Sequence, residues 1–152
     1  MSTNNLVDTF KSHAFLSGLS ERHLMLLASG AVPFKAAAGE LLAREGDTAN
    51  AFYLIQAGHV SLGTRGPGPA DVQIQRAGPG EVFGWSWLVA PHKWQFDCRA
   101  VDDVHGIKFN AEWLRDLCEQ DHELSHQLFK HLATVLASRL AATRRQLLQR
   151  PI

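Results

Sequence analysis

The residues of this chain that could do chemistry gather at residues 78–100, in the sequence GPGEVFGWSWLVAPHKWQFDCRA. Gly78, Gly80 and Gly84 give backbone freedom at a point where an apparent strand passes into a very short helical turn. The turn after Gly84 leaves backbone N–H groups without partners, and such groups at a helix start favour an anion. The stretch therefore predicts a small-molecule pocket that can accept negative charge.

Aromatic bulk lines the same stretch. Trp85, Trp87 and Trp94 are three of the four tryptophans in the chain. Two interpretations stay open: the indoles form the aromatic wall of a site for a flat or apolar ligand, or they pack as core and fill the cavity. Polar groups that could still hold an anion of another shape follow in the same stretch, namely Ser86, His92 and Lys93.

Other chemistry is not expected. His122 and His126 lie one helical turn apart and could share a zinc ion, but no third ligand is evident and a solvated helix face explains them. No nucleophile, base and orienting group can be assembled, and GxSxG, HExxH and P-loop motifs are missing, so we expect no enzyme. Cys98 and Cys118 have no CxxC spacing and are expected to be buried free thiols.

Length and composition limit the kinds of protein that this chain can be. The 152 residues form one ordinary domain, and 15 basic against 15 acidic residues give a net charge of zero. This balance argues against a general binder of nucleic acid or anionic membranes. No leader segment and no apolar run of about 18 residues is found, so we expect a cytoplasmic protein. We expect no certain cofactor, and at most a small ligand.

Helical spacing and then strand spacing divide the chain. Residues 1–30 are expected to form short helices, one over residues 6–18 and a second that Ser20 caps. From residue 31 to 109 the apolar period is two and glycines punctuate the runs. Eight short strands favour a mainly β fold, a jelly-roll-like barrel or β-roll with flanking helices. The expected strands are 31–35, 40–44, 51–57, 59–64, 71–77, 81–83, 94–102 and 104–109, with a hairpin tip at 65–70.

Helix returns over residues 110–150. Asn110 is a good N-cap, and a second, long helix is expected from near Asp121 to about Gln149. One stripe of this helix, Leu124, Leu128, Leu132 and Val135, can dock on the β unit. A heptad seam follows Phe129, Ala133, Leu136, Leu140, Thr143 and Leu147, and predicts a homodimer through this helix. The alternative is a helix packed wholly on its own domain. The helix also has a basic end, explained by favourable placement near a helix C-terminus and formed by Arg139, Arg144, Arg145 and Arg150.

The element order, together with AGELLAREGDTANAFYLIQAGHVSL and GPGEVFG, resembles the cyclic nucleotide-binding domain of the catabolite activator family. The resemblance covers nearly the whole chain and implies that residues 78–100 are a phosphate-binding cassette for a cyclic nucleotide. It also implies a DNA-reading helix-turn-helix after the long helix, and the chain ends at Ile152 before one could begin, so we expect no nucleic-acid partner for this chain alone. The matching residues are Gly39, Gly46, Asp47, Phe52, Tyr53, Leu54, Ile55, Gly58, Val60, Gly80, Phe83, Gly84, Arg99 and Ala100.

The cassette departs from the family pattern at its two polar anchors. The family places a ribose-binding glutamate after the FG pair and a phosphate-binding arginine near the end, where this chain has Trp85 and Trp94. Strand alternation turns Trp94 toward the interior and Arg99 away from it, so Arg99 does not replace the missing cation. Loss of both anchors should cost roughly 3 to 6 kcal/mol of binding free energy, and stacking of an indole on a base would restore about 1 to 3 kcal/mol of it.

We therefore expect a dimeric, non-enzymatic sensor with weakened or altered recognition of cAMP or cGMP, or of another small anionic or aromatic ligand. The alternative is an interaction module in which tryptophans fill the pocket and the fold serves only for dimerisation. The candidate ligand-binding residues are Phe83, Gly84, Trp85, Ser86, Trp87, Trp94 and Gln95, with Thr143 from the long helix as a further contact that the resemblance implies.

Overall fold

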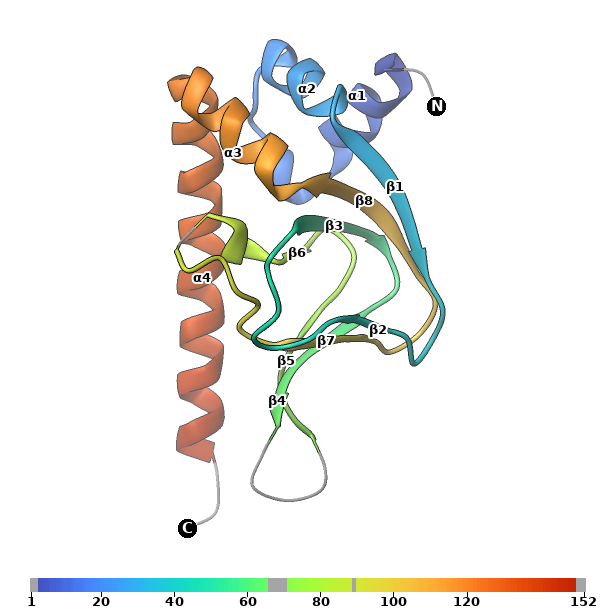
Figure 1. Ribbon diagram of the computed structural model, residues 1–152, viewed down its shortest axis with the longest axis vertical. Helices are drawn as coiled ribbons and strands as arrows, with labels where there is room; N and C mark the ends of the chain where they lie inside the picture. Colours follow the sequence, from blue (N-terminus) through green and yellow to red (C-terminus); the bar gives the residue numbers. More distant parts are fainter. Residues whose placement is uncertain (1–2, 66–70, 89, 150–152) are drawn as a thin grey trace.

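Two four-stranded antiparallel sheets form the centre of the structure, a computed structural model that describes residues 3–65, 71–88 and 90–149. One sheet has the order β1-β8-β3-β6 and the other β2-β7-β4-β5, and Figure 1 shows one above the other. The strands are β1 (Ala31–Ala36), β2 (Leu41–Ala43), β3 (Ala51–Ala57), β4 (Val60–Arg65), β5 (Asp71–Ala77), β6 (Val82–Phe83), β7 (Asp97–Ala100) and β8 (Val104–Asn110).

The expected closure into a barrel and the mainly β composition were wrong. The two sheets are not closed on each other, and within the described ranges the helices contain more residues than the strands. The strand pairings found in the described residues all lie within one sheet or the other, and each sheet ends in one short strand, β6 with two residues and β2 with three. The expected hairpin tip at residues 66–70 lies outside the described residues.

The expected strand at residues 94–102 is shorter in the structure, where β7 covers Asp97–Ala100. Trp94 is instead tied to the loop between β2 and β3. Its N–H donates to the carbonyl of Asp47 (2.8 Å), and its carbonyl accepts from the N–H of Gly46 (2.9 Å). These two bonds occupy the backbone of Trp94 before β7 begins.

Short helices precede the sheets, as expected, but the first is broken. Instead of one helix over residues 6–18, α1 (Thr3–Ser12) is followed by the 3-10 turn η1 (Ala14–Leu16). The break lies at His13, whose Nδ1 accepts from the N–H of Phe15 (3.2 Å) while Nε2 lies 3.0 Å from the carbonyl of Ile55. Burial lowers the pKa of His13, which favours the neutral ring that this arrangement needs.

The helix starts were predicted well. Ser20 caps α2 (Glu21–Ala28) by accepting from the N–H of His23 at 3.2 Å. Asn110 caps α3 (Ala111–Gln120) by accepting from the N–H of Trp113 at 2.9 Å. The long helix α4 (His122–Gln149) begins after Asp121, whose carboxylate accepts from the N–H of Leu124. Its docking stripe is confirmed, since Leu124, Leu128 and Leu132 are buried and Val135 is partly buried.

The sheet of β1, β8 and β3 separates two hydrophobic cores. Figure 1 shows α1, α2 and α3 above this sheet and α4 running beside both sheets. Strand β3 is buried on both sides: Phe52 and Leu54 face the helices, whereas Tyr53 and Ile55 face the space between the sheets. This alternation makes β3 a wall between the helical core and the inter-sheet core.

Gly106 lies where β8 crosses β3, and a Cβ there would come within 2.0 Å of the Leu54 carbonyl oxygen and 2.9 Å of Phe34. We expect Gly106→Ala to reduce the free energy of unfolding by about 3 kcal/mol or more, because backbone must move. The control is Gly39→Ala, where φ is +88° but no atom lies within 4 Å, so backbone strain of about 1 to 2 kcal/mol is the expected loss. Equal urea midpoints for the two variants would contradict this packing.

Each core contains one free cysteine, Cys98 between the sheets and Cys118 among the helices. Burial raises the pKa of Cys98 to about 12 and that of Cys118 to about 11. Since only the thiolate is alkylated, we expect iodoacetamide at pH 8 to label the folded protein on the order of 10² to 10³ times more slowly than the unfolded protein. The rate should rise about tenfold per pH unit while the fold persists. Mass spectrometry of each cysteine peptide tests this, and rapid labelling of either folded cysteine at pH 7 would contradict it.

Candidate functional site

The cassette lies at one end of the paired sheets, next to α4 (Figure 1). After β6 the chain turns at Gly84, with φ of +95°, into the 3-10 turn η2 (Trp85–Trp87). A Cβ on Gly84 would lie 2.9 Å from both the Ala51 carbonyl oxygen and the Trp94 ring. Glycine is therefore needed here for its positive φ and for the close approach of Trp94.

Trp94 fills the interior of the pocket, and its predicted inward orientation is confirmed. Its side chain is only 5% exposed, with ring centroids 6.1 Å from Tyr53 and 6.4 Å from Phe83. Tyr53 and Phe83 stack on each other at 4.5 Å. Arg99 is exposed on the other face and donates to the carbonyl of Gly39 at 2.8 Å, so it supplies no charge to the interior.

The remaining cavity between the sheets is very small. Its volume is about 10 Å³, barely the space of one water molecule, whereas ligand pockets usually measure several hundred Å³. Trp85 is partly buried at this cavity and meets Phe96 edge to face at 5.9 Å. The pocket is therefore closed by indole rings in this conformation. Its lining comprises Leu62, Gly84, Trp85, Ser86, Trp94, Gln95, Phe96 and Cys98.

Arg139 of α4 lies over the outer side of this closed pocket. Its guanidinium carbon is 4.6 Å from the centroid of the Trp85 ring, a cation–π distance. One terminal nitrogen, Nη2, donates to the carbonyl of Val82, and the other, Nη1, is buried with no hydrogen-bond partner in the described ranges. Burial lowers the pKa of Arg139. A cation from α4 thus reaches the cassette.

Sequence reasoning missed Arg139, because it grouped this residue with the basic end of the helix. The signal that could have found it is its spacing of one turn from Thr143. Thr143 is partly buried, and its Oγ1 accepts from Gln75 Nε2 at 2.7 Å. The same Gln75 nitrogen donates to the carbonyl of Arg139 at 2.5 Å. Gln75 therefore fastens β5 to the turn of α4 that holds both residues.

The structure brings most of the expected site residues together. Gly84, Trp85, Ser86, Trp94 and Gln95 line the small cavity, and Phe83 stacks beside Trp94 as described above. Trp87 is the exception. It is fully buried on the opposite side, in the helical core, where its ring lies 5.7 Å from Phe52. The direction of Trp87 is set by the 3-10 turn, which strand alternation does not describe.

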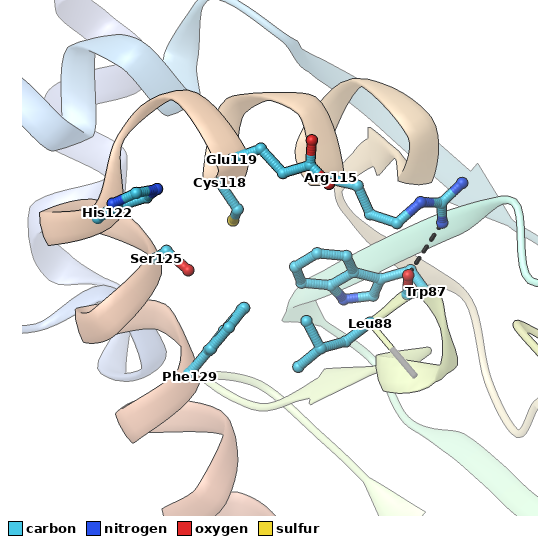
Figure 2. Close-up of a pocket in the computed structure, with 8 residues that line it drawn as sticks. All are labelled: Trp87, Leu88, Arg115, Cys118, Glu119, His122, Ser125 and Phe129. Atoms are coloured by element: carbon cyan, nitrogen blue, oxygen red, sulfur yellow. Dashed lines mark hydrogen bonds between the residues drawn. The ribbon is translucent and has the colours of Figure 1, made fainter. Parts of the chain in front are cut away.

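A larger cavity of about 390 Å³ lies on that opposite side, between η2, α3 and α4. Figure 2 shows the Trp87 ring at one side of this cavity with Phe129 of α4 facing it. Trp87 Nε1 is buried without a hydrogen-bond partner in the described part of the chain, and Arg115 donates to the Trp87 carbonyl at 2.9 Å. Sequence reasoning gave no sign of this cavity. It is lined by Trp87, Leu88, Arg115, Cys118, Glu119, His122, Ser125 and Phe129.

Metal and membrane chemistry find no support in the described residues. His122 and His126 are both exposed, and no group of three or more potential His, Cys, Asp or Glu ligands occurs in those ranges. No helix among the described residues combines the length and apolarity needed to cross a bilayer.

Comparison with known proteins identifies related sequences and related structures. The CRP-like cAMP-activated global transcriptional regulator of Mycobacterium tuberculosis is 27% identical over 109 residues, which cover 72% of this chain and 47% of that protein. This chain thus spans about half the length of its curated relative. A cyclic nucleotide-binding domain from Methylobacillus flagellatus has the same fold, with a TM-score of 0.81, 17% identity and coverage of 99% of this chain and 84% of that one.

The Thermus thermophilus catabolite activator protein aligns with a TM-score of 0.70 and 25% identity, covering 88% of this chain and 61% of that one. The sequence pattern that defines the family "Cyclic nucleotide-binding domain" matches residues 33–121, more than half of the chain and including the whole cassette. The glycine turn, the paired sheets and the long helix beside the cassette agree with this match. The chain belongs to the cyclic nucleotide-binding domain family.

Proposed function

We propose that this chain is a non-enzymatic, cytoplasmic regulatory module in which recognition of cyclic nucleotides has been altered. Membership of the family supports a ligand-sensing role. The observation that carries the altered recognition is the packing of Trp94, which is 5% exposed in the space where a ligand would have to enter. An indole supplies neither the negative charge that binds ribose hydroxyls nor the positive charge that binds a phosphate.

A ligand that enters must displace part of this packing. Trp94 and Trp85 are the rings that close the cavity, and Trp85 is covered by Arg139 of α4. A ligand that moves Trp85 therefore also alters the contact between the cassette and the long helix. Such a ligand would shift the population of α4 from one arrangement toward another. The size of the shift depends on how much more tightly the ligand binds the open pocket than the closed one.

The long helix is also our proposed dimer interface. Four seam residues are large apolar side chains with substantial exposure: Phe129 (40%), Leu136 (39%), Leu140 (72%) and Leu147 (62%). Exposed leucines at heptad spacing are typical of a helix that pairs with a second copy. Pairing around a two-fold axis would bring two cassettes into one regulated assembly.

The second candidate function is a dimerising module that binds no ligand. The cavity of about 10 Å³ between the sheets favours it, because the space is already occupied by side chains. In this case the cyclic nucleotide-binding fold supplies a rigid support for the α4 seam. The two candidates differ in one observable property, which is whether the cassette responds to a small molecule.

Titration with cAMP and cGMP distinguishes them through tryptophan fluorescence. The loss of two charged hydrogen-bonding anchors costs roughly 3 to 6 kcal/mol, enough to turn a site of about micromolar affinity into one of about millimolar affinity. We therefore expect weak, saturable responses with a dissociation constant of about 1 mM. The signal should persist in Trp113→Phe, because Trp113 stacks on Phe109 in the helical core, outside the cassette.

Saturable binding of cAMP at low micromolar concentration, abolished in Trp94→Ala, would contradict altered recognition. Trp94→Ala removes a buried indole and should lower the free energy of unfolding by about 3 to 5 kcal/mol, so its folding is checked by circular dichroism. Silent fluorescence with both nucleotides and with inorganic phosphate would favour the ligand-free module.

Leu140→Glu tests the proposed dimer. Burial of one leucine side chain at the seam would stabilise the dimer by about 1.5 to 3 kcal/mol. Because the substitution occurs in both subunits, loss of two leucines and the introduction of two charges should raise the dimer dissociation constant about 100-fold or more. Light scattering should change from a dimer to a monomer mass. Ser138→Glu is the matched control, since Ser138 is exposed on α4 away from the seam. A monomer mass for the unmodified protein at micromolar concentration would refute the dimer.

A further inference from the structure

We propose that Arg139 is the anion-binding group of the cassette pocket, so that the positive charge of the site comes from α4 instead of the cassette. This inference rests on the proposed ligand-sensing function and names the residue and ligand class that would carry it. The ligand would be a compact oxyanion, either a phosphate ester or a carboxylate, that reaches the pocket between Trp85 and α4.

The first support is the incomplete bonding of the guanidinium. Arg139 Nη2 donates to the Val82 carbonyl, while Nη1 is buried and has no hydrogen-bond partner within the described residues. A buried donor without a partner has lost its hydrogen bonds to water and gained none from the protein, and the loss is greater when the group is charged. An oxyanion bound to Nη1 would remove that deficit.

The second support is the charge around Arg139. None of the ion pairs found in the described ranges involves it. The carboxylate that acts on Arg139 electrostatically is that of Glu81, which is exposed and accepts from the N–H of Gly78 at 2.9 Å. The guanidinium is therefore removed from water and has no carboxylate in direct contact. A ligand anion could take that position.

The third support is the direction of the charge. The positive charge of Arg139 is near enough to Cys98, a residue that lines the small cavity between the sheets, to oppose in part the rise in the thiol pKa that burial causes. The guanidinium also lies 4.6 Å from the ring of Trp85, which lines the same cavity. The lysine and arginine of the cassette itself, Lys93 and Arg99, are both exposed, and Arg99 donates to the carbonyl of Gly39. Arg139 thus lies against the Trp85 wall of the pocket, where a displacement of that ring would bring the guanidinium next to a ligand.

The geometry of arginine indicates the ligand class. A guanidinium presents parallel N–H donors that match two oxygens of a phosphate or carboxylate. If Nη2 gives up the Val82 carbonyl, both terminal nitrogens can turn to one anion. The ring of Trp85, freed from the guanidinium, would then be available to stack on a flat part of the same ligand.

This recognition would couple the ligand to α4. The carbonyl of Arg139 and the hydroxyl of Thr143 are both held by Gln75 of β5. An anion that draws the Arg139 side chain inward would tighten the turn of α4 that Gln75 already fastens. Ligand binding and the position of the seam would then depend on the same residue.

The test compares Arg139→Gln and Arg139→Lys with Arg144→Gln, a control that removes an exposed arginine of the same helix. Thermal unfolding is followed over a series of inorganic phosphate concentrations at constant ionic strength. We expect phosphate to raise the midpoint of the unmodified protein and of Arg144→Gln. The rise should be smaller in Arg139→Lys and missing in Arg139→Gln. Equal rises in Arg139→Gln and in the unmodified protein, or no rise in either, would overturn the inference.

Nucleotide titrations separate this result from that of the proposed function. Removal of a charged hydrogen-bond donor should weaken cAMP binding by about tenfold or more in Arg139→Gln, so that the saturable response expected near 1 mM is lost over the same concentration range. Binding of adenosine, which has no phosphate, should not change. Unchanged cAMP affinity in Arg139→Gln would overturn the role of Arg139 while leaving ligand sensing intact. A phosphate response that needs Arg139, without any response to cyclic nucleotides, would instead limit the site to other oxyanions.

Discussion

The packing of Trp94 between the two sheets is the contact on which the rest of the site depends. Gly84 must lack a side chain to admit the Trp94 ring, and Tyr53 and Phe83 stack into the surface that receives it. A buried indole contributes a large apolar area, so the pocket is stable without a ligand. A polar ligand must compete with this area as well as with water. The fold of the family is retained, and indole rings occupy the space between its two sheets.

The positive charge next to the cassette comes from a neighbouring helix in this structure. The cassette itself presents rings, and the buried cation comes from a helix that lies beside it, through Arg139 over Trp85. Gln75 holds the same turn of that helix to β5. The cassette and the long helix therefore share contacts. In a site built this way, a change in ligand preference and a change in helix geometry can arise from one substitution.

Local signals in the sequence were sufficient for much of the fold. The caps Ser20 and Asn110 were correct because a side-chain acceptor three residues before an N–H is a short-range property. The inward direction of Trp94 was correct, but alternation along a strand is not its cause, because Trp94 precedes β7 and its backbone bonds to the loop between β2 and β3. Barrel closure was wrong because pairing between strands depends on contacts between residues far apart in the sequence, and α1 ended early because His13 bonds to Ile55, 42 residues away. Arg139 was missed since its partner, Trp85, is distant in sequence and its orientation depends on how α4 docks.

Strand β3 gives the molecule a property that neither cavity has by itself. Tyr53 contacts Trp94 on one side of this strand, and its neighbour Phe52 contacts Trp87 on the other. The core that contains Trp94 and the core that contains Trp87 are thus separated at this point by a single strand, β3. A rearrangement beside Tyr53 that shifts β3 would therefore also move Phe52 and the Trp87 ring packed against it.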